Sequence, residues 1–156
     1  MAIASKPSFT MDEFIHELDE MDRLVDTLPV ARDMQEPIAQ IIYDGINLNF
    51  ALEQDAWGNT WAPHAPLTIK LYGPHPILIL SSTMVHAATT TGAPGNVVIV
   101  EDRTFIVGVD LPYAATQQFG DPSRNIPARP FEDASEETIE RLAVMTGDYF
   151  EQEVLG

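Results

Sequence analysis

The chain has 156 residues and no cysteine. The absence of cysteine excludes a disulfide framework, a thiolate metal site and a cysteine nucleophile, and it fits a reducing compartment. Long apolar runs are also missing: residues 77–80 are four apolar side chains in a row, far short of the roughly 20 that a membrane helix needs. Residues 1–9 contain one lysine and no long apolar run, so we expect a flexible N-terminal arm rather than a signal peptide. The sequence therefore predicts a soluble protein with no membrane partner.

Positive charge is scarce. Eight lysines and arginines stand against 24 aspartates and glutamates, which gives a formal net charge of −16. Residues 11–36 hold nine acidic and two basic side chains, and residues 132–156 hold eight and one. We interpret these two segments as the solvated faces of amphipathic helices. Because the basic patch that gives most nonspecific affinity for nucleic acid is missing, tight DNA binding is not expected.

Signatures of catalysis are absent as well. No serine lies in a Gly-x-Ser-x-Gly turn, and the glycines of residues 91–95 lack the lysine and the spacing of a phosphate-binding loop. The histidines lack the short spacing that is typical of metal ligands; they are His16, His64, His75 and His86. We therefore expect no catalytic residue, no cofactor and no metal, and a metal-dependent hydrolase that uses these histidines remains the less favoured alternative.

Two helices are expected in the first third of the chain. Residues 10–13 match a capping box, and the helix that follows carries an apolar stripe that Pro29 ends. The stripe consists of Phe14, Leu18, Met21, Val25 and Leu28. A second helix is predicted over residues 31–53, with a kink or a break at Pro37 or Gly45.

The middle of the chain changes in composition. Residues 55–76 are rich in Pro, Gly and Asn, so we predict an ordered loop without a helix, anchored by Trp57 and Trp61. Residues 77–80 predict a buried strand. Residues 82–91 predict a short helix or an irregular crossing rich in small side chains.

Further along, the pattern favours a hairpin and then short elements. Residues 96–100 and 104–109 are two β-branched runs separated by polar residues, which is typical of a β-hairpin. Residues 112–120 predict one or two helical turns. Residues 126–131 contain two prolines and should be extended.

A last helix should begin after Asp133 or Ser135, either of which can cap it. Its apolar stripe comprises Ile139, Leu142, Met145 or Thr146, Tyr149 and Val154. The chain shows no repeat and no linker between folding units. We therefore predict one α+β domain over residues 1–156, with a small antiparallel-rich sheet as its core, framed by N-terminal and C-terminal helices.

Two blocks of the sequence resemble a known family. The first comprises residues 58–63, 67–68, 70 and 76–78, and the second comprises residues 113–115, 117–120 and 126–131. In this order they resemble the phage virion morphogenesis family, whose members include the Mu-like G protein and the tail completion proteins. The Gln-Phe-Gly and Ile-Pro-Ala-Arg-Pro-Phe motifs of the second block are the sharper signal. Gln117 stands where the family commonly has histidine.

The resemblance implies a structural virion protein, not an enzyme, of a long-tailed phage. Such a protein is assembled in the bacterial cytoplasm and works at the neck or tail end, as one subunit of a ring that completes the tail or joins it to the head. Its partners would be other copies of itself, six as a first guess, with the head-tail connector and the tail tube or sheath proteins. DNA would only pass through the lumen. A transient assembly chaperone, absent from the finished virion, is the alternative.

The candidate interface and structural residues come from these blocks: Trp61, Tyr113, Gln118, Gly120, Pro127, Arg129, Pro130 and Phe131. We expect Trp61 to anchor its loop and Gly120 to permit a sharp turn. The prolines should stiffen a segment that presents Arg129 at the surface, where it pairs with a carboxylate of a neighbouring subunit. In the other interpretation, Phe131 closes the domain's own core and Arg129 pairs with an acid of the last helix.

Overall fold

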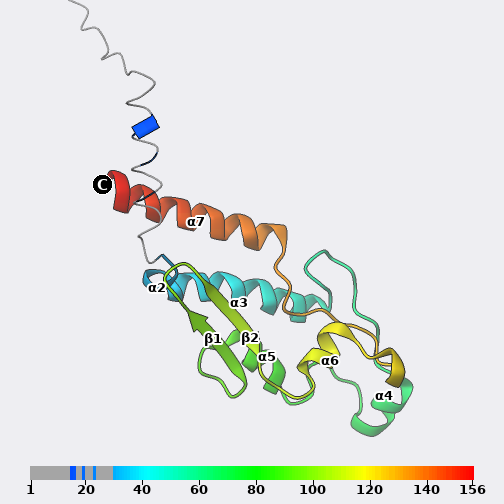
Figure 1. The fold of residues 1–156 in the computed structure, drawn as a ribbon. Coiled ribbons are helices and arrows are strands. Elements are labelled where there is room, and N and C mark those ends of the chain that lie inside the picture. Colours follow the sequence, from blue (N-terminus) through cyan, green and yellow to red (C-terminus); the bar gives the residue numbers. More distant parts are fainter. Residues whose placement is uncertain (1–14, 17–18, 20–22, 24–29) are drawn as a thin grey trace, which may run out of the picture.

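The computed structural model describes Ile15, His16, Asp19, Arg23 and residues 30–156. The predicted N-terminal arm, and all but four positions of the helix predicted after residues 10–13, lie outside the described residues. Figure 1 shows several helices and a β-hairpin that lies beside α3 and α5, which confirms the α+β class. The elements are α2 (Val30–Asp33), α3 (Gln35–Leu52), α4 (Pro66–Tyr72), α5 (Thr83–Thr89), β1 (Asn96–Val100), β2 (Phe105–Val109), α6 (Ala114–Phe119), the 3-10 helix η1 (Pro122–Arg124) and α7 (Glu136–Leu155).

The second predicted helix is present, but its break is not at Pro37 or Gly45. The chain leaves helical geometry at Met34, between α2 and α3. Pro37 falls in the first turn of α3, where backbone N–H groups have no partner within the helix, so its missing N–H costs nothing there. α3 runs without interruption through Gly45.

Gly45 permits close approach of α7 to α3. A Cβ atom at this position would lie 2.5 Å from Oγ1 of Thr138 in α7. Thr138 is buried, and its hydroxyl group is hydrogen-bonded to that of Ser135 at 3.0 Å, so it cannot retreat freely. The absence of a side chain at Gly45 therefore determines how closely the two helices pack.

We expect Gly45→Ala to lower the free energy of unfolding by about 1 to 2 kcal/mol, because the clash outweighs the higher helix propensity of alanine. Chemical denaturation measures this change. Gly147→Ala is the matched control: Gly147 is also within a helix, but a Cβ there would have nothing within 4 Å. The control should raise the free energy of unfolding by about 0.5 to 1 kcal/mol. If both variants are stabilised, Gly45 is not a packing position.

α7 begins as predicted, with Ser135 as its N-cap. The hydroxyl oxygen of Ser135 accepts from the backbone amide of Thr138 at 3.2 Å. The hydroxyl group of Tyr149 donates to Asp33 of α2 at 2.7 Å, and this bond raises the pKa of the tyrosine to about 12. The predicted apolar stripe is wrong at Ile139, whose side chain is exposed, because the face toward α3 lies nearer Thr138 and Leu142.

The predicted hairpin is confirmed. β1 and β2 pair antiparallel from Asn96 opposite Val109 to Val100 opposite Phe105. The hairpin packs on α5 and α3. The side-chain nitrogen Nδ2 of Asn96 donates to the carbonyl oxygen of Ala87 in α5 at 2.7 Å. The sheet has two strands, so it supplies only part of the core.

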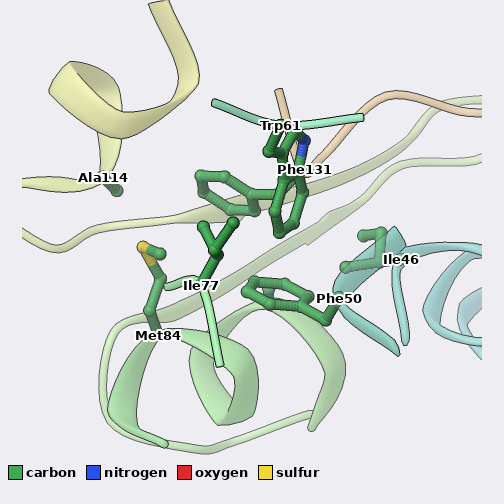
Figure 2. Packing of buried hydrophobic residues seen from close by; sticks show 8 residues of the cluster. Ile46, Phe50, Trp61, Ile77, Met84, Ala114 and Phe131 are labelled. Atoms are coloured by element: carbon green, nitrogen blue, oxygen red, sulfur yellow. The ribbon is translucent and has the colours of Figure 1, made fainter. Parts of the chain in front are cut away.

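The core is instead built mainly by helices and connecting segments, which differs from the expectation of a sheet at the centre. Figure 2 shows Phe50 of α3 facing Trp61, Ile77 and Phe131, which come from three different segments without regular secondary structure. The rings of Phe50 and Trp61 meet edge to face with centroids 5.7 Å apart. Phe131 is fully buried. The connecting segments are therefore held by aromatic packing rather than by strand pairing.

Three expectations for residues 55–80 are wrong. Residues 66–72 form α4, since Pro66 stands at its first position, where proline is favoured, and no proline follows within the helix. Trp57 is not an anchor, because 69% of it is exposed. Residues 77–80 form no strand: the amide of Ile79 donates to the carbonyl oxygen of Pro76 in a turn, and Leu80 is exposed. No helix in the described part of the chain is long and apolar enough to cross a membrane.

Candidate functional site

The segment that precedes α7 is held by side chains from distant parts of the chain. Nε1 of Trp61 donates to the carbonyl oxygen of Pro130 at 2.9 Å. Nδ2 of Asn49 donates to the carbonyl oxygen of Phe131 at 3.1 Å. The backbone amide of Phe131 donates to Oε1 of Gln118 at 2.8 Å. Because buried backbone groups need partners, these bonds allow an irregular segment to cross the core.

Arg129 joins the two sequence blocks directly. Its Nε donates to the carbonyl oxygen of Ala62 at 2.8 Å, and Nη2 donates to that of Pro63 at 2.9 Å. Nη1 donates to the side-chain oxygen of Gln117 at 3.4 Å, and the amide of Arg129 donates to the backbone carbonyl oxygen of Gln117 at 2.7 Å. The guanidinium group thus ties the loop before α4 to α6.

The expectation that Arg129 lies at the surface is wrong: only 8% of the residue is exposed. Among the described residues, no carboxylate pairs with it, so the pairing with an acid of the last helix is also absent. Burial lowers the pKa of Arg129, since its charged form loses hydration. A buried cation whose partners are all neutral is unusual, because buried charges normally have a counter-ion.

A pocket of about 950 Å³ lies beside Arg129, and we call it the α4–α6 pocket. It is bounded by the loop before α4 with the start of α4, by residues 78–84, and by the segment from α6 to Arg129. Figure 1 shows α4 and α6 at the same end of the molecule. The lining consists of Pro63, His64, Ala65, Pro66, Thr68, His75, Leu78, Leu80, Ser81, Ser82, Thr83, Met84, Tyr113, Gln117, Pro122, Asn125, Ile126, Pro127 and Arg129. Both blocks that resemble the phage family therefore contribute to one pocket.

The pocket differs in charge from the rest of the chain. None of the lining residues is an aspartate or a glutamate, although the chain has 24 of them, and Arg129 contributes a positive charge. His64 and His75 also line the pocket, with their ring centroids 4.2 Å apart. The lining therefore combines apolar and neutral polar side chains with one cation and no anion, which favours a partner that carries a carboxylate or another anionic group.

The two pocket histidines are fixed by backbone oxygens. Nε2 of His64 donates to the carbonyl oxygen of His75 at 3.1 Å, and Nδ1 of His75 donates to that of Gly73 at 2.9 Å. His86 is on α5 and does not line the pocket. Across the described part of the chain, no three side chains of the types that bind metals gather at one place. These rings therefore serve as part of the wall.

Of the remaining predicted residues, Tyr113 and Pro127 line the pocket on the α6 side, and Gly120 lies between them in the chain. Gly120 turns the chain after α6 with φ of +76°, and Tyr113 and Pro127 are exposed at the edge. η1 follows this turn and is capped by Asp121, whose carboxylate accepts from Ser123. Hydrogen bonds from Ser123 and then from Arg124 lower the pKa of Asp121 to about 2. Hydrogen bonds thus hold the turn that precedes the lining residues Pro122 and Asn125.

The loop that carries Trp61 is organised by Asp55, which the sequence did not single out. Its carboxylate accepts from the amides of Trp57 and Asn59 and from Nδ2 of Asn59. Burial alone would raise the pKa of Asp55, but these bonds, with one from Gly58, hold it below the usual value. This hydrogen-bonded turn returns the chain to the core, where the backbone amide of Trp61 donates to the carbonyl oxygen of Glu53.

Glu132 gives a prediction about pH. Its Oε1 is buried without a partner among the described residues, and burial followed by the nearby Asp133 raises its pKa. A carboxyl group whose pKa is higher in the folded state lowers stability as pH rises through that pKa. We expect Glu132→Gln to raise the melting temperature at pH 7 by about 2 to 4 °C, which corresponds to about 1 kcal/mol.

The gain should shrink toward pH 4, where the wild-type side chain is protonated as well. Thermal melts at several pH values measure the difference. Glu151→Gln, at an exposed position of α7, is the matched control and should change the melting temperature little at any pH. A gain that does not depend on pH would contradict the assignment.

Sequence reasoning missed Asn49, although an asparagine in a helix interior is a weak signal, since it has low helix propensity and needs a reason to be there. The bonds to Ala62 and Pro63 from Arg129 leave no signal in the sequence, because any residue could supply a backbone oxygen.

Comparison of the chain with protein-family models, with curated proteins and with solved structures found no match.

Proposed function

We propose that this protein is a non-enzymatic structural component of a tailed bacteriophage, of the virion morphogenesis or tail completion type. It acts as a subunit of a closed ring at the head-tail junction, and six copies are the first guess from the rotational symmetry of tails. Its partners are other copies of itself, the head-tail connector, and the tube or sheath proteins. The ring forms at the neck or tail end of the virion, after assembly in the host cytoplasm.

One observation carries this proposal. The two separated sequence blocks that resemble the phage family meet at the α4–α6 pocket, and Arg129 of the second block bonds directly to Ala62 and Pro63 of the first. Their convergence supports the interpretation of the blocks as one functional unit.

Mass spectrometry of purified virions tests the proposal. The protein should be present at a fixed copy number of more than one, and a reconstruction of the neck should contain it as a closed ring. A reconstruction with a single copy would contradict the ring. Absence from purified virions, together with a requirement for the gene during assembly, would favour the transient chaperone instead.

A metal-dependent hydrolase is distinguished by elemental analysis. Stoichiometric zinc in protein purified without added metal would support that alternative and contradict the proposal. His64 and His75 are the only pair of histidine rings in contact among the described residues, so alanine at both positions should abolish such binding.

The proposed lumen predicts weak DNA binding. The chain has eight lysines and arginines against 24 acidic residues, and Arg32, Arg124 and Arg141 are each engaged with an aspartate. We expect the dissociation constant for duplex DNA at physiological salt to be weaker than about 10⁻⁴ M, below the usual nonspecific range. A gel-shift titration measures it. Micromolar affinity would contradict an acidic lumen through which DNA passes.

A further inference from the structure

In the described part of the chain, no residue supplies an anionic partner to Arg129 in the α4–α6 pocket. The structure gives partners to three N–H groups of the Arg129 guanidinium, while arginine carries five. All three partners are neutral oxygens, and no described carboxylate reaches the group. A cation that is 92% buried, lines a pocket and lacks a counter-ion indicates a ligand that brings a negative charge.

α7 presents a face of the required chemistry. Glu136, Glu140, Val144, Gly147 and Glu151 are all exposed, and they recur at steps of four, four, three and four, so they form one stripe. We call this stripe the outer face of α7. It lies opposite Thr138, Leu142, Met145 and Tyr149, which are at least partly buried. The outer face combines carboxylates with a central apolar and glycine portion.

Gly147 is an independent sign that this face is covered in an assembly. A glycine within a helix costs roughly 1 kcal/mol relative to alanine. At position 45 the close approach of Thr138 explains why a glycine is present. At position 147 an added Cβ would meet nothing within 4 Å. The described chain therefore gives no packing reason for Gly147, whereas close approach of a second molecule does.

No residue of α7 lines the pocket of its own chain. Figure 1 shows the C-terminal end of α7 at the end of the molecule where α2 lies, away from α4 and α6. α7 packs on α3, and the bond from Tyr149 to Asp33 holds it to α2. Among the described residues, no carboxylate of the same chain therefore serves as the counter-ion of Arg129, and a second molecule can supply one.

We propose that the α4–α6 pocket of one copy receives the outer face of α7 from a second copy, with Glu140 opposite Arg129 and Val144 in the apolar part of the pocket. The inference rests on the proposed function, since a ring needs two different surfaces that fit each other. A pocket and a helix face on the same chain make a heterologous contact, which repeats from copy to copy and can close. The pocket volume of about 950 Å³ is enough for a few side chains of the docked helix.

Cysteine cross-linking tests the contact cleanly, because the chain has no cysteine of its own. Ser81→Cys places a thiol in the exposed lining of the pocket, and Val144→Cys places one on the outer face. Mixing the two single variants with a short bis-maleimide should give cross-linked dimers. The double variant should give a ladder of multimers, both in concentrated protein and in virions.

Two matched controls accompany the experiment. Ile99→Cys, an equally exposed position on the outer side of the hairpin, should give at least about tenfold less product with Val144→Cys than Ser81→Cys gives. Glu140→Arg should lower the yield of the Ser81–Val144 product by about tenfold or more, because like charges that face each other oppose docking. Glu153→Arg makes the same charge change on another side of α7 and should leave the yield nearly unchanged.

The outcomes separate this inference from the proposed function. If Ser81→Cys links no better than Ile99→Cys, or if Glu153→Arg weakens linking as much as Glu140→Arg, the contact is wrong even where the protein is found in virions. If Ser81→Cys in virions links to a different phage protein, the pocket serves that partner instead. If the protein is absent from virions but the purified variants form the ladder, the contact stands and the proposed location is wrong.

Discussion

Replacing Trp61 with alanine should lower the free energy of unfolding by about 3 to 5 kcal/mol, the range for truncating a large buried aromatic side chain. Trp61 is 4% exposed and packs edge to face on Phe50. Figure 2 shows it above Phe131 in the same cluster. Its loss would leave a cavity at the point where the irregular segments meet, and it would leave the carbonyl oxygen of Pro130 without its donor.

Such a loss is a large part of the stability of an ordinary domain, which is about 5 to 15 kcal/mol. Denaturant titrations followed by circular dichroism measure the change without depending on tryptophan fluorescence. Trp57→Ala is the matched control, since it removes the same side chain four residues away at a position that is 69% exposed. The control should stay within about 0.5 kcal/mol of the wild type. Equal effects of the two substitutions would show that Trp61 has no special place in the core.

The elements that were predicted correctly are those with a local signal. β-branched runs on either side of a polar turn predict the hairpin at residues 96–109, and Ser135 predicts the start of α7, because capping and strand propensity act over a few residues. The antiparallel sheet and the start of α7 were predicted from these local signals. α6 lies where one or two helical turns were expected, and α5 lies in the segment for which a short helix or an irregular crossing was expected.

The expectations that failed concern residues whose environment is set at long range. Arg129 was expected at the surface because two prolines flank it, but its oxygen partners lie 66 and 67 residues earlier in the chain. Trp57 and Trp61 lie in the same loop and have similar sequence surroundings. The hydrogen-bonded turn around Asp55 leaves Trp57 exposed and returns Trp61 to the core. Residues 77–80 are apolar enough for a strand, but no neighbouring strand is available to pair with them.

The pocket could be predicted only in part. The resemblance selected Tyr113, Pro127 and Arg129, which all line the pocket. The candidate residues did not include His64 or the lining residues from Leu80 to Met84. Burial of the Arg129 charge, on which the inferred contact depends, is a property of packing that composition cannot reveal.

Gly120→Ala should be as damaging as Trp61→Ala although it adds only one methyl group. Gly120 has φ of +76° and ψ of 173°, a region that is essentially restricted to glycine. An added Cβ would also lie 2.7 Å from the amide nitrogen of Ala128 and 2.9 Å from the carbonyl oxygen of Ile126. Both neighbours are backbone atoms, so relief requires that the chain move rather than that a side chain rotate.

Gly73 provides the matched control, because it ends α4 with nearly the same backbone angles, 74° and 177°, and an added Cβ there has nothing within 4 Å. Gly73→Ala should therefore cost only the backbone strain, about 1 to 3 kcal/mol, whereas Gly120→Ala should cost the strain and the clash, about 3 to 5 kcal/mol in total. Denaturant titrations of both variants measure the difference. If the two variants are equally destabilised, the close approach of Ala128 to Gly120 is not important for stability.

Movement of the backbone at Gly120 has a further consequence for the pocket. The segment that approaches Gly120 continues directly into Arg129, whose amide donates to Gln117 in the last turns of α6. Pushing that segment away would separate the guanidinium group from Ala62 and Pro63 and open the pocket wall. At temperatures where Gly120→Ala and Gly73→Ala are both folded, only Gly120→Ala should reduce cross-linking between Ser81→Cys and Val144→Cys. Equal cross-linking in the two backgrounds would mean that the pocket does not depend on this turn.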